Sequence, residues 1–155
     1  MSDIALIALA AGLAVAVPGI MSAIGVGMTG IAAAAATAED PKKFSRLFIL
    51  EVLPGTQGIY GFIGGFMILI FTGLLGGSLR AGVSGAVVVA AAIPVILQGF
   101  TAIPQGKVAT AGVAAVSKRP ETFTASMMYT VMVEIYAILG LLATILMLTS
   151  KAIIP

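Results

Sequence analysis

The chain has 155 residues, of which 60% are hydrophobic and only 9% charged, and its formal net charge is +2. So little charge excludes a soluble globular domain of this size, and it also excludes a basic surface for nucleic acids. Because the sequence contains neither Cys nor His, it excludes disulfides, thiolate metal sites and imidazole catalysis. We therefore predict an all-α integral membrane protein.

Four apolar segments follow one another along the chain, separated by three short polar breaks. Each segment has 29–35 residues, whereas about 20 residues are enough to cross the hydrocarbon core. We therefore expect four transmembrane helices that tilt or project beyond the core. The four segments are Ile4–Thr37, Phe44–Leu75, Val83–Ser117 and Thr122–Ser150.

The basic residues beside these segments predict an orientation in the membrane. Five of them flank the first and third breaks, and two lie on the other side. Since basic residues favour the cytoplasmic side, we expect the loops near 38–46 and 117–121 in the cytoplasm. Both termini are then expected outside, in a multi-pass protein of the cell (plasma) membrane. The five are Lys42, Lys43, Arg46, Lys118 and Arg119, and the two are Arg80 and Lys151.

Small residues recur at helical spacing in the first two segments. They let membrane helices approach closely, because packing rather than a hydrophobic drive holds helices together in lipid. This spacing fits packing within one four-helix bundle and also packing between many copies in a ring. The residues are Gly19, Ala23 and Gly27 in the first segment and Gly55, Gly58, Gly61 and Gly64 in the second.

The two halves of the chain resemble each other. A shift of 79 residues aligns them without a gap and places Pro41 on Pro120, and 11 of the 41 positions in residues 22–62 are then identical. We interpret the chain as two tandem helical hairpins, 1–79 and 80–155. Such hairpins are parallel repeats, unlike the inverted repeats of many transporters.

Glu134 is the lone charged residue of the fourth segment. An ionisable group at membrane depth costs about 2.5–3.5 kcal/mol on insertion scales, and it usually marks an ion or proton path. The 79-residue shift places Gly55 opposite Glu134. Only the second hairpin therefore carries a carboxylate at this position.

Polar side chains of two other segments are expected at the depth of Glu134. Thr56, Gln105 and Glu134 each lie eleven or twelve residues from the end of their segment. At about 1.5 Å per residue, this places them roughly 17–18 Å from the nearest turn. Gln57 is one residue deeper than Thr56, and Tyr60 is one helical turn further on.

Two prolines are expected to loosen the helices near this layer. Pro54 cannot donate to the helical hydrogen-bond ladder, so the turn around it is distorted. A loosened turn can aim the backbone carbonyl of Leu53 at a ligand. Pro104, directly before Gln105, is expected to act in the same way in the third segment.

A carboxylate with amide, hydroxyl and backbone oxygens is a set of hard ligands, suited to Na⁺ or Ca²⁺. One negative charge matches a monovalent ion better than Ca²⁺. A proton needs only the carboxyl group, so Na⁺ and H⁺ both remain open. Interhelical hydrogen bonding is the structural alternative for Gln57 and Gln105.

Three motifs identify a family that the whole chain resembles. They are LPGTQGIYGF (Leu53–Phe62), QGKVATAG (Gln105–Gly112) and VEIYAILG (Val133–Gly140). They resemble the rotor-ring proteolipids of bacterial V-type (A/V-type) Na⁺-ATPases, also called subunit K or the duplicated c subunit.

The resemblance implies a non-catalytic subunit that assembles with identical copies into a homo-oligomeric ring in the lipid bilayer. A soluble head that hydrolyses ATP would turn this ring through a central-stalk subunit. A membrane stator subunit with a basic residue would exchange the ion at Glu134 between two half-channels. The Na⁺ ligands implied by the resemblance are the Leu53 carbonyl and the side chains of Thr56, Gln57, Gln105 and Glu134. Tyr60 would donate to the Glu134 carboxylate and hold it in place.

Glu51 and Lys107 are two further charged residues within the apolar segments. We expect them to form a structural ion pair between the second and third helices. A solvated ring interior is an alternative environment for both residues, and an ion exit path is an alternative role for Glu51.

A ring that carries H⁺ is the main alternative function. A stand-alone channel or transporter is disfavoured. A channel needs a continuous polar stripe, whereas polarity here is confined largely to one layer, and transporters usually have inverted repeats.

Overall fold

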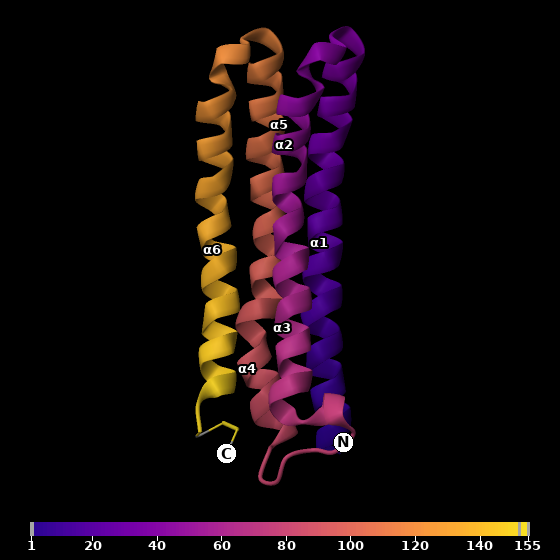
Figure 1. The fold of residues 1–155 in the computed structure, drawn as a ribbon, viewed down its shortest axis with the longest axis vertical. Coiled ribbons are helices and arrows are strands. Elements are labelled where there is room, and N and C mark those ends of the chain that lie inside the picture. The colour runs from indigo at the N-terminus through magenta and orange to yellow at the C-terminus, as the bar shows by residue number, and fades with distance from the viewer. Residues whose placement is uncertain (1, 152, 155) are drawn as a thin grey trace.

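The computed structural model describes residues 2–151, 153 and 154, which form an elongated bundle of helices (Figure 1). Four helical segments are long and apolar enough to cross a membrane, namely Asp3–Glu39, Pro41–Thr72, Gly85–Lys118 and Pro120–Thr149. The predicted all-α membrane fold is therefore confirmed.

Irregular turns interrupt the second and third of these segments. The first is the continuous helix α1 (Asp3–Glu39), and the fourth is α6 (Phe123–Thr149). The second contains α2 (Phe44–Val52) and α3 (Thr56–Thr72), and the third contains α4 (Gly85–Leu97) and α5 (Ala102–Lys118). The 3₁₀ turns are η1 (Pro41–Lys43), η2 (Leu53–Gly55), η3 (Leu74–Gly76), η4 (Gln98–Thr101) and η5 (Pro120–Thr122).

Both interruptions lie beside the prolines that were expected to loosen the helices. Turn η2 contains Pro54, and η4 ends at Thr101, three residues before Pro104. Because a proline ring clashes with the carbonyl four residues earlier, Pro104 disturbs Phe100, which lies within η4. The loosened turns of the second and third segments are therefore observed.

The predicted ends of these two segments need small corrections. The second helical rod ends at Thr72 rather than Leu75, because Gly73 takes a left-handed φ of 83° that favours glycine. The third begins at Gly85 rather than Val83. There the Asp3 carboxylate accepts a hydrogen bond from the Gly85 amide at 2.7 Å, which satisfies an open donor at the start of α4.

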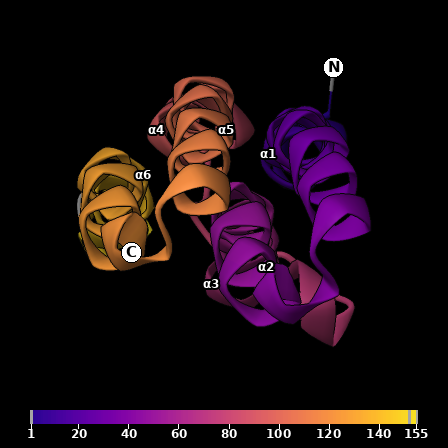
Figure 2. The same ribbon diagram turned by 90° about the horizontal axis from the view of Figure 1, so that it is seen from above.

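The helices form two hairpins that run in parallel. Both termini and the α3–α4 loop lie at one end of the bundle, and the two hairpin turns lie at the other (Figure 1). Seen from above, α1 and α6 lie at opposite sides of the bundle, with α5 and the α2–α3 rod between them (Figure 2). Each hairpin therefore keeps one flank that the other hairpin does not cover.

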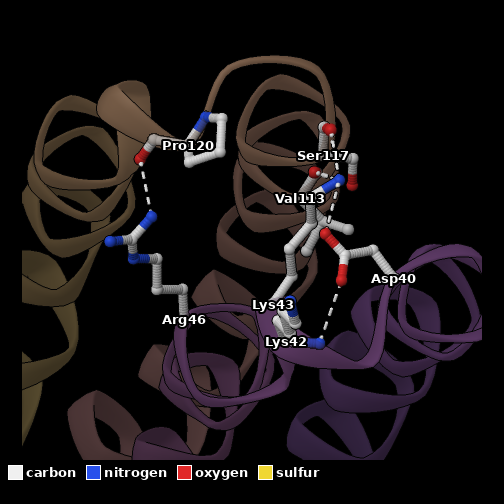
Figure 3. Close-up of polar contacts among 7 residues, drawn as sticks. All are labelled: Asp40, Lys42, Lys43, Arg46, Val113, Ser117 and Pro120. Carbon is white, nitrogen blue, oxygen red and sulfur yellow. Dashed lines mark hydrogen bonds and ion pairs between the residues drawn. The ribbon is translucent and has the colours of Figure 1, made fainter.

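Polar contacts tie the two hairpin turns together (Figure 3). The Lys43 ammonium donates to the Ser117 carbonyl at the end of α5, at 2.9 Å, and pairs with Asp40 at 3.5 Å. The Arg46 guanidinium reaches the Pro120 carbonyl at 3.5 Å. The Lys43 contact places a cation beside the open carbonyls at the C-terminus of α5, which is favourable, and the Arg46 contact reaches the first residue of η5. Together they link the two turns.

The hairpin turns repeat each other in detail. Asp40 before η1 has φ −147° and ψ 96°, and Arg119 before η5 has φ −139° and ψ 94°. These two residues are 79 positions apart. In the half of the bundle that holds the turns, the structure thus follows the 79-residue register of the sequence.

The register changes by one residue in the other half. A Cβ added at Gly61 would lie 2.5 Å from the Ala14 carbonyl, and one added at Gly140 would lie 2.8 Å from the Pro94 carbonyl. Gly140 follows Gly61 by 79 positions, but Pro94 follows Ala14 by 80. The prediction of an alignment without a gap is therefore wrong by one residue. The third segment has one residue fewer than the first, and the change in register lies near the turn η4.

The small residues have two different environments. Gly25 and Gly106 bring α1 and α5 together, since a Cβ added at Gly106 would lie 2.7 Å from the Gly25 carbonyl. At Gly19 and Gly27, an added Cβ would meet nothing within 4 Å. The outer side of these two glycines is therefore open in the described chain, although the Gly19 backbone lies 3.5 Å from a Cβ added at Gly58 of α3.

The predicted ion pair between Glu51 and Lys107 does not form among the residues that the structure describes. The one ion pair within that part of the chain joins Lys43 and Asp40. Glu51 instead lies against α1, because the absence of a side chain at Gly30 leaves room for its carboxylate. Lys107 is exposed on α5.

Candidate ion-binding site

Glu134 lies in the middle of α6 and is buried, with 7% of its surface exposed. Its Oε1 accepts a hydrogen bond from the Tyr60 hydroxyl at 2.6 Å. Its Oε2 lies 2.8 Å from the Thr56 hydroxyl and 2.8 Å from the Gln105 amide nitrogen. Three donors from two other helices thus satisfy the carboxylate, and hydrogen bonds to an ionised group are the strong ones.

Helix α3 positions two of these donors. Thr56 and Tyr60 are four residues apart, so they lie on the same face of the helix. Thr56 is the first residue of α3, directly after η2. Because η2 turns more tightly than an α-helix, the Thr56 hydroxyl also lies 2.9 Å from the Leu53 carbonyl. The backbone oxygen expected from the sequence is therefore beside the carboxylate cluster.

Two fully buried glutamines complete the cluster. The Gln57 amide donates to the Gln105 side-chain carbonyl, and the Gln57 carbonyl oxygen lies 3.4 Å from the Thr56 hydroxyl. The Gln105 amide also reaches the Thr130 backbone carbonyl at 3.2 Å. Amide groups from α3 and α5 thereby link the cluster to α6.

Gln98 in η4 belongs to the same network, although it was not among the residues expected from the sequence. Its amide nitrogen donates to the Gln57 backbone carbonyl at 3.1 Å, and its Oε1 is buried without a partner in the described chain. The available signal was its spacing, since Gln98 precedes Gln105 by seven residues. Seven residues are two helical turns, which place both amides on one face.

The structure thus brings together most of the residues proposed from the sequence. Oxygens of four side chains and one backbone carbonyl surround a small region between α3, α5 and α6, with Tyr60 at its edge. They belong to Leu53, Thr56, Gln57, Gln105 and Glu134. Glu51 and Lys107 take no part in this cluster.

The charge of the cluster limits the ion that it suits. Among the described residues, no three His, Cys, Asp or Glu side chains lie close enough to hold a metal together. Glu134 alone supplies a negative charge, and the other oxygens are neutral. A monovalent ion would neutralise this charge, whereas divalent ions are usually held by more than one carboxylate.

The chain is similar in sequence to known proteins over most of its length. The sequence model of the ATP synthase C-subunit family matches residues 9–68 and again residues 89–147. The V-type sodium ATPase subunit K of Enterococcus hirae is 47% identical over 130 residues, which cover 83% of this chain and 81% of that protein. The A-type ATP synthase subunit K of Methanocaldococcus jannaschii is 40% identical over 141 residues. That match covers 91% of this chain but only 60% of the archaeal protein.

Proposed function

The chain belongs to the ATP synthase C-subunit family, and from that premise we propose that it is the ion-carrying subunit of a membrane rotor ring. Its transported ion is Na⁺, bound at Glu134. Identical copies form the ring, and ATP hydrolysis takes place on other subunits of the rotary ATPase.

The oxygen cluster around Glu134 carries this proposal. A dehydrated Na⁺ needs several oxygens to replace its lost water, because an ion without replacement ligands is prohibitively costly to bury. The Leu53 carbonyl and the side chains of Thr56, Gln57 and Gln105 carry such oxygens within one small region, where the Gln105 oxygen accepts from the Gln57 amide. Together with the carboxylate they make a set of five hard ligands for one monovalent charge.

The amides favour Na⁺ over H⁺ as the ion. A proton binds to a carboxyl group and needs at most one acceptor, so an H⁺ carrier has no use for two buried glutamines. The similarity to a protein named a sodium ATPase subunit supports the same choice. An H⁺-carrying ring remains the second candidate, since Glu134 alone would support it.

The proposal includes partners and an orientation. A stator subunit in the membrane presents a basic residue, which displaces Na⁺ from Glu134 between two half-channels. A central-stalk subunit links the ring to the ATPase head. By the distribution of basic residues, the end of the bundle that holds η1 and η5 faces the cytoplasm, and the termini face outward.

Carbodiimide labelling tests the choice of ion. Carbodiimide reacts with the protonated carboxyl group, so bound Na⁺ should protect Glu134, and protection should grow as the pH rises and proton competition weakens. In the double variant Gln57→Leu with Gln105→Leu, labelling should persist while protection by Na⁺ is largely lost. The measurement is the rate of labelling of the purified ring, with and without NaCl.

Potassium chloride at equal ionic strength controls for salt, and the variant Glu134→Gln controls for labelling elsewhere. Wild-type labelling that is indifferent to high Na⁺ at neutral pH would contradict the Na⁺ assignment and support the H⁺ ring.

A further inference from the structure

A groove of about 420 Å³ lies between α1 and α2, in the half of the bundle that holds the hairpin turns. We call it the α1–α2 groove. It is lined by Gly30, Ala33, Ala34, Thr37 and Ala38 of α1 and by Phe44, Leu47, Phe48 and Glu51 of α2. Both phenylalanines and Ala34 are exposed at its rim.

Glu51 places a carboxylate at the inner end of this groove. A Cβ added at Gly30 would lie 2.8 Å from Glu51 Oε1, so the carboxylate rests on the backbone of α1. Among the described residues, Glu51 makes no hydrogen bond or ion pair. A charged acceptor at membrane depth without a partner is costly, so a donor from outside the chain is expected.

The second hairpin contains an equivalent groove, and there it is filled. The residues 79 positions after Ala34, Thr37, Phe44 and Phe48 are Val113, Val116, Phe123 and Met127. They belong to α5 and α6 and pack in one hydrophobic cluster with Leu47 and Leu50 of α2, so the corresponding space is filled. Leu50 inserts there, since its Cδ1 lies 3.4 Å from a Cβ added at Gly112.

Tyr129 is the register equivalent of Leu50, 79 residues later on α6. It is 69% exposed, and its hydroxyl has no partner within the described chain. In this half of the bundle each hairpin thus offers one groove and one inserting side chain. Leu50 already fills the groove of the second hairpin, whereas Tyr129 and the α1–α2 groove are both left open.

The differences between the two halves compensate each other. Val113 and Val116 correspond to the smaller Ala34 and Thr37, so the open groove has more room. The inserting residue is larger in return, with Tyr129 in place of Leu50. At the inner end, Glu51 replaces Thr130, which provides an acceptor where the tyrosine provides a hydroxyl donor.

We propose that Tyr129 of one copy fills the α1–α2 groove of the next copy in the ring and donates its hydroxyl to the Glu51 carboxylate. The contact rests on the ring assembly of the proposed function. It explains why a carboxylate is retained in the membrane at a position that takes no part in the ion cluster.

A second pair of residues supports the same placement of the next copy. Within the chain, Gly106 of α5 packs on Gly25 of α1. By the 79-residue register, Gly106 corresponds to Gly27 and Gly25 corresponds to Pro104. The same contact between copies would therefore join Gly27 of the next copy to Pro104 of this one. Gly27 has nothing within 4 Å of an added Cβ, and Pro104 is exposed. Both surfaces are therefore open where the next copy requires them.

Lys107 does not occupy the equivalent position for this role. By the 79-residue register, Lys107 corresponds to Met28 on α1, and Glu51 corresponds to Thr130 on α6. A Lys107–Glu51 contact between copies would thus correspond to a Met28–Thr130 contact within one chain. Within the chain, α1 and α6 lie at opposite sides of the bundle (Figure 2). A contact between Lys107 of one copy and Glu51 of the next would therefore break the repeat.

Cysteine cross-linking tests this contact, because the natural sequence contains no cysteine. In the variant Tyr129→Cys with Ala34→Cys, a short thiol cross-linker should join neighbouring copies of the purified ring. A denaturing gel should then show a ladder of dimers, trimers and larger species. The matched control is Tyr136→Cys with Ala34→Cys, since Tyr136 is 66% exposed on the same helix but two turns deeper. It should give no ladder, and neither should the single-cysteine variants.

A double-variant cycle tests the hydrogen bond. Tyr129→Phe should speed the dissociation of the ring into monomers by about tenfold, because it removes a hydrogen bond to a charged group. In a Glu51→Met background the same change should have little effect. Tyr136→Phe removes a hydroxyl two helical turns away from Tyr129, so its effect on dissociation should be the same in both backgrounds.

Intact rings without a Tyr129–Ala34 ladder, or additive effects in the cycle, would overturn the contact. A ladder from Lys107→Cys with Ala34→Cys instead would assign the groove to α5 of the neighbour. A wild-type chain that remains monomeric would contradict the proposed function itself, so the two failures are distinguishable.

Discussion

The two carboxylate oxygens of Glu134 have different neighbours, and this separates the role of Tyr60 from that of Thr56 and Gln105. Oε2 accepts hydrogen bonds from the Thr56 hydroxyl and from the Gln105 amide nitrogen, both at 2.8 Å. Oε1 has the Tyr60 hydroxyl at 2.6 Å as its hydrogen-bond donor. In the proposed Na⁺ site, Oε2 is therefore the oxygen that would face the ion, while Tyr60 would fix the orientation of the carboxylate.

The variant Tyr60→Phe should weaken Na⁺ binding and leave Glu134 in place. A hydrogen bond to a charged group contributes about 1.5–3 kcal/mol, so the Na⁺ concentration for half-protection from carbodiimide should rise roughly tenfold or more. Labelling without Na⁺ should be no slower than in the wild type. Tyr136→Phe removes a hydroxyl two residues from Glu134 that takes no part in the cluster, and it should change neither value. Unaltered protection in Tyr60→Phe would show that Tyr60 does not position the carboxylate.

At the scale of helices, the sequence predicted the elements better than their internal geometry. Hydropathy located the four transmembrane segments, because an apolar run long enough to cross a bilayer is typical of a transmembrane helix. Pro54 and Pro104 located the irregular turns of the second and third segments, since a proline removes a donor from the helical ladder, although Pro18 and Pro94 lie inside helices without such a turn. Depth counting placed Thr56, Gln105 and Glu134 at one level, because the rise per residue is nearly constant.

The errors at this scale concern side-chain direction and local packing. Counting along a helix gives the depth of Glu51 and Lys107 but not their faces, and the structure places them apart. The residue that the third segment lacks at η4, relative to the first segment, could not be found by aligning Ala- and Gly-rich segments, because many registers score alike. It became visible through the contacts of Gly61 and Gly140 with different helices.

The close contact of α1 with α3 depends on Gly61. In the variant Gly61→Ala, the new methyl group would lie 2.5 Å from the Ala14 carbonyl and 2.6 Å from the Pro18 ring. Backbone cannot move away as a flexible side chain can, so we expect a destabilisation of about 1–3 kcal/mol. The measurement is the free energy of unfolding of the detergent-solubilised chain.

Gly12→Ala in α1 is the matched control for Gly61→Ala. An added Cβ at Gly12 meets nothing within 4 Å, and its counterpart 80 residues later is Ala92. Alanine is favoured over glycine in a helix by about 1 kcal/mol, so this variant should be as stable as the wild type or more stable. Equal destabilisation by both changes would show that glycine is not required at Gly61 for close approach.

At the scale of the whole molecule, duplication and divergence leave one ion cluster for every two hairpins. The cluster lies where the first hairpin packs on the second. The equivalent place between the second hairpin and the next copy would hold the register equivalents of its members. Glu134 is replaced there by Gly55, Gln105 by Val26, Gln57 by Tyr136 and Thr56 by Ile135. None of these replacements offers a charge, and an ion at that interface would lack ligands.

Equilibrium binding of radioactive Na⁺ to the purified ring should therefore saturate at one ion per chain rather than one per hairpin. The variant Glu134→Gln should assemble and bind none, because it keeps the shape of the side chain and removes the charge. Two ions per chain would contradict this account and require ligands at the interface between copies. If the ring turns as proposed, one ion per chain means that each transported ion turns it by a full copy of four membrane segments. A ring with the same number of hairpins and a carboxylate on each hairpin would turn half as far per ion. A ring with one carboxylate for every two hairpins therefore moves fewer ions per turn.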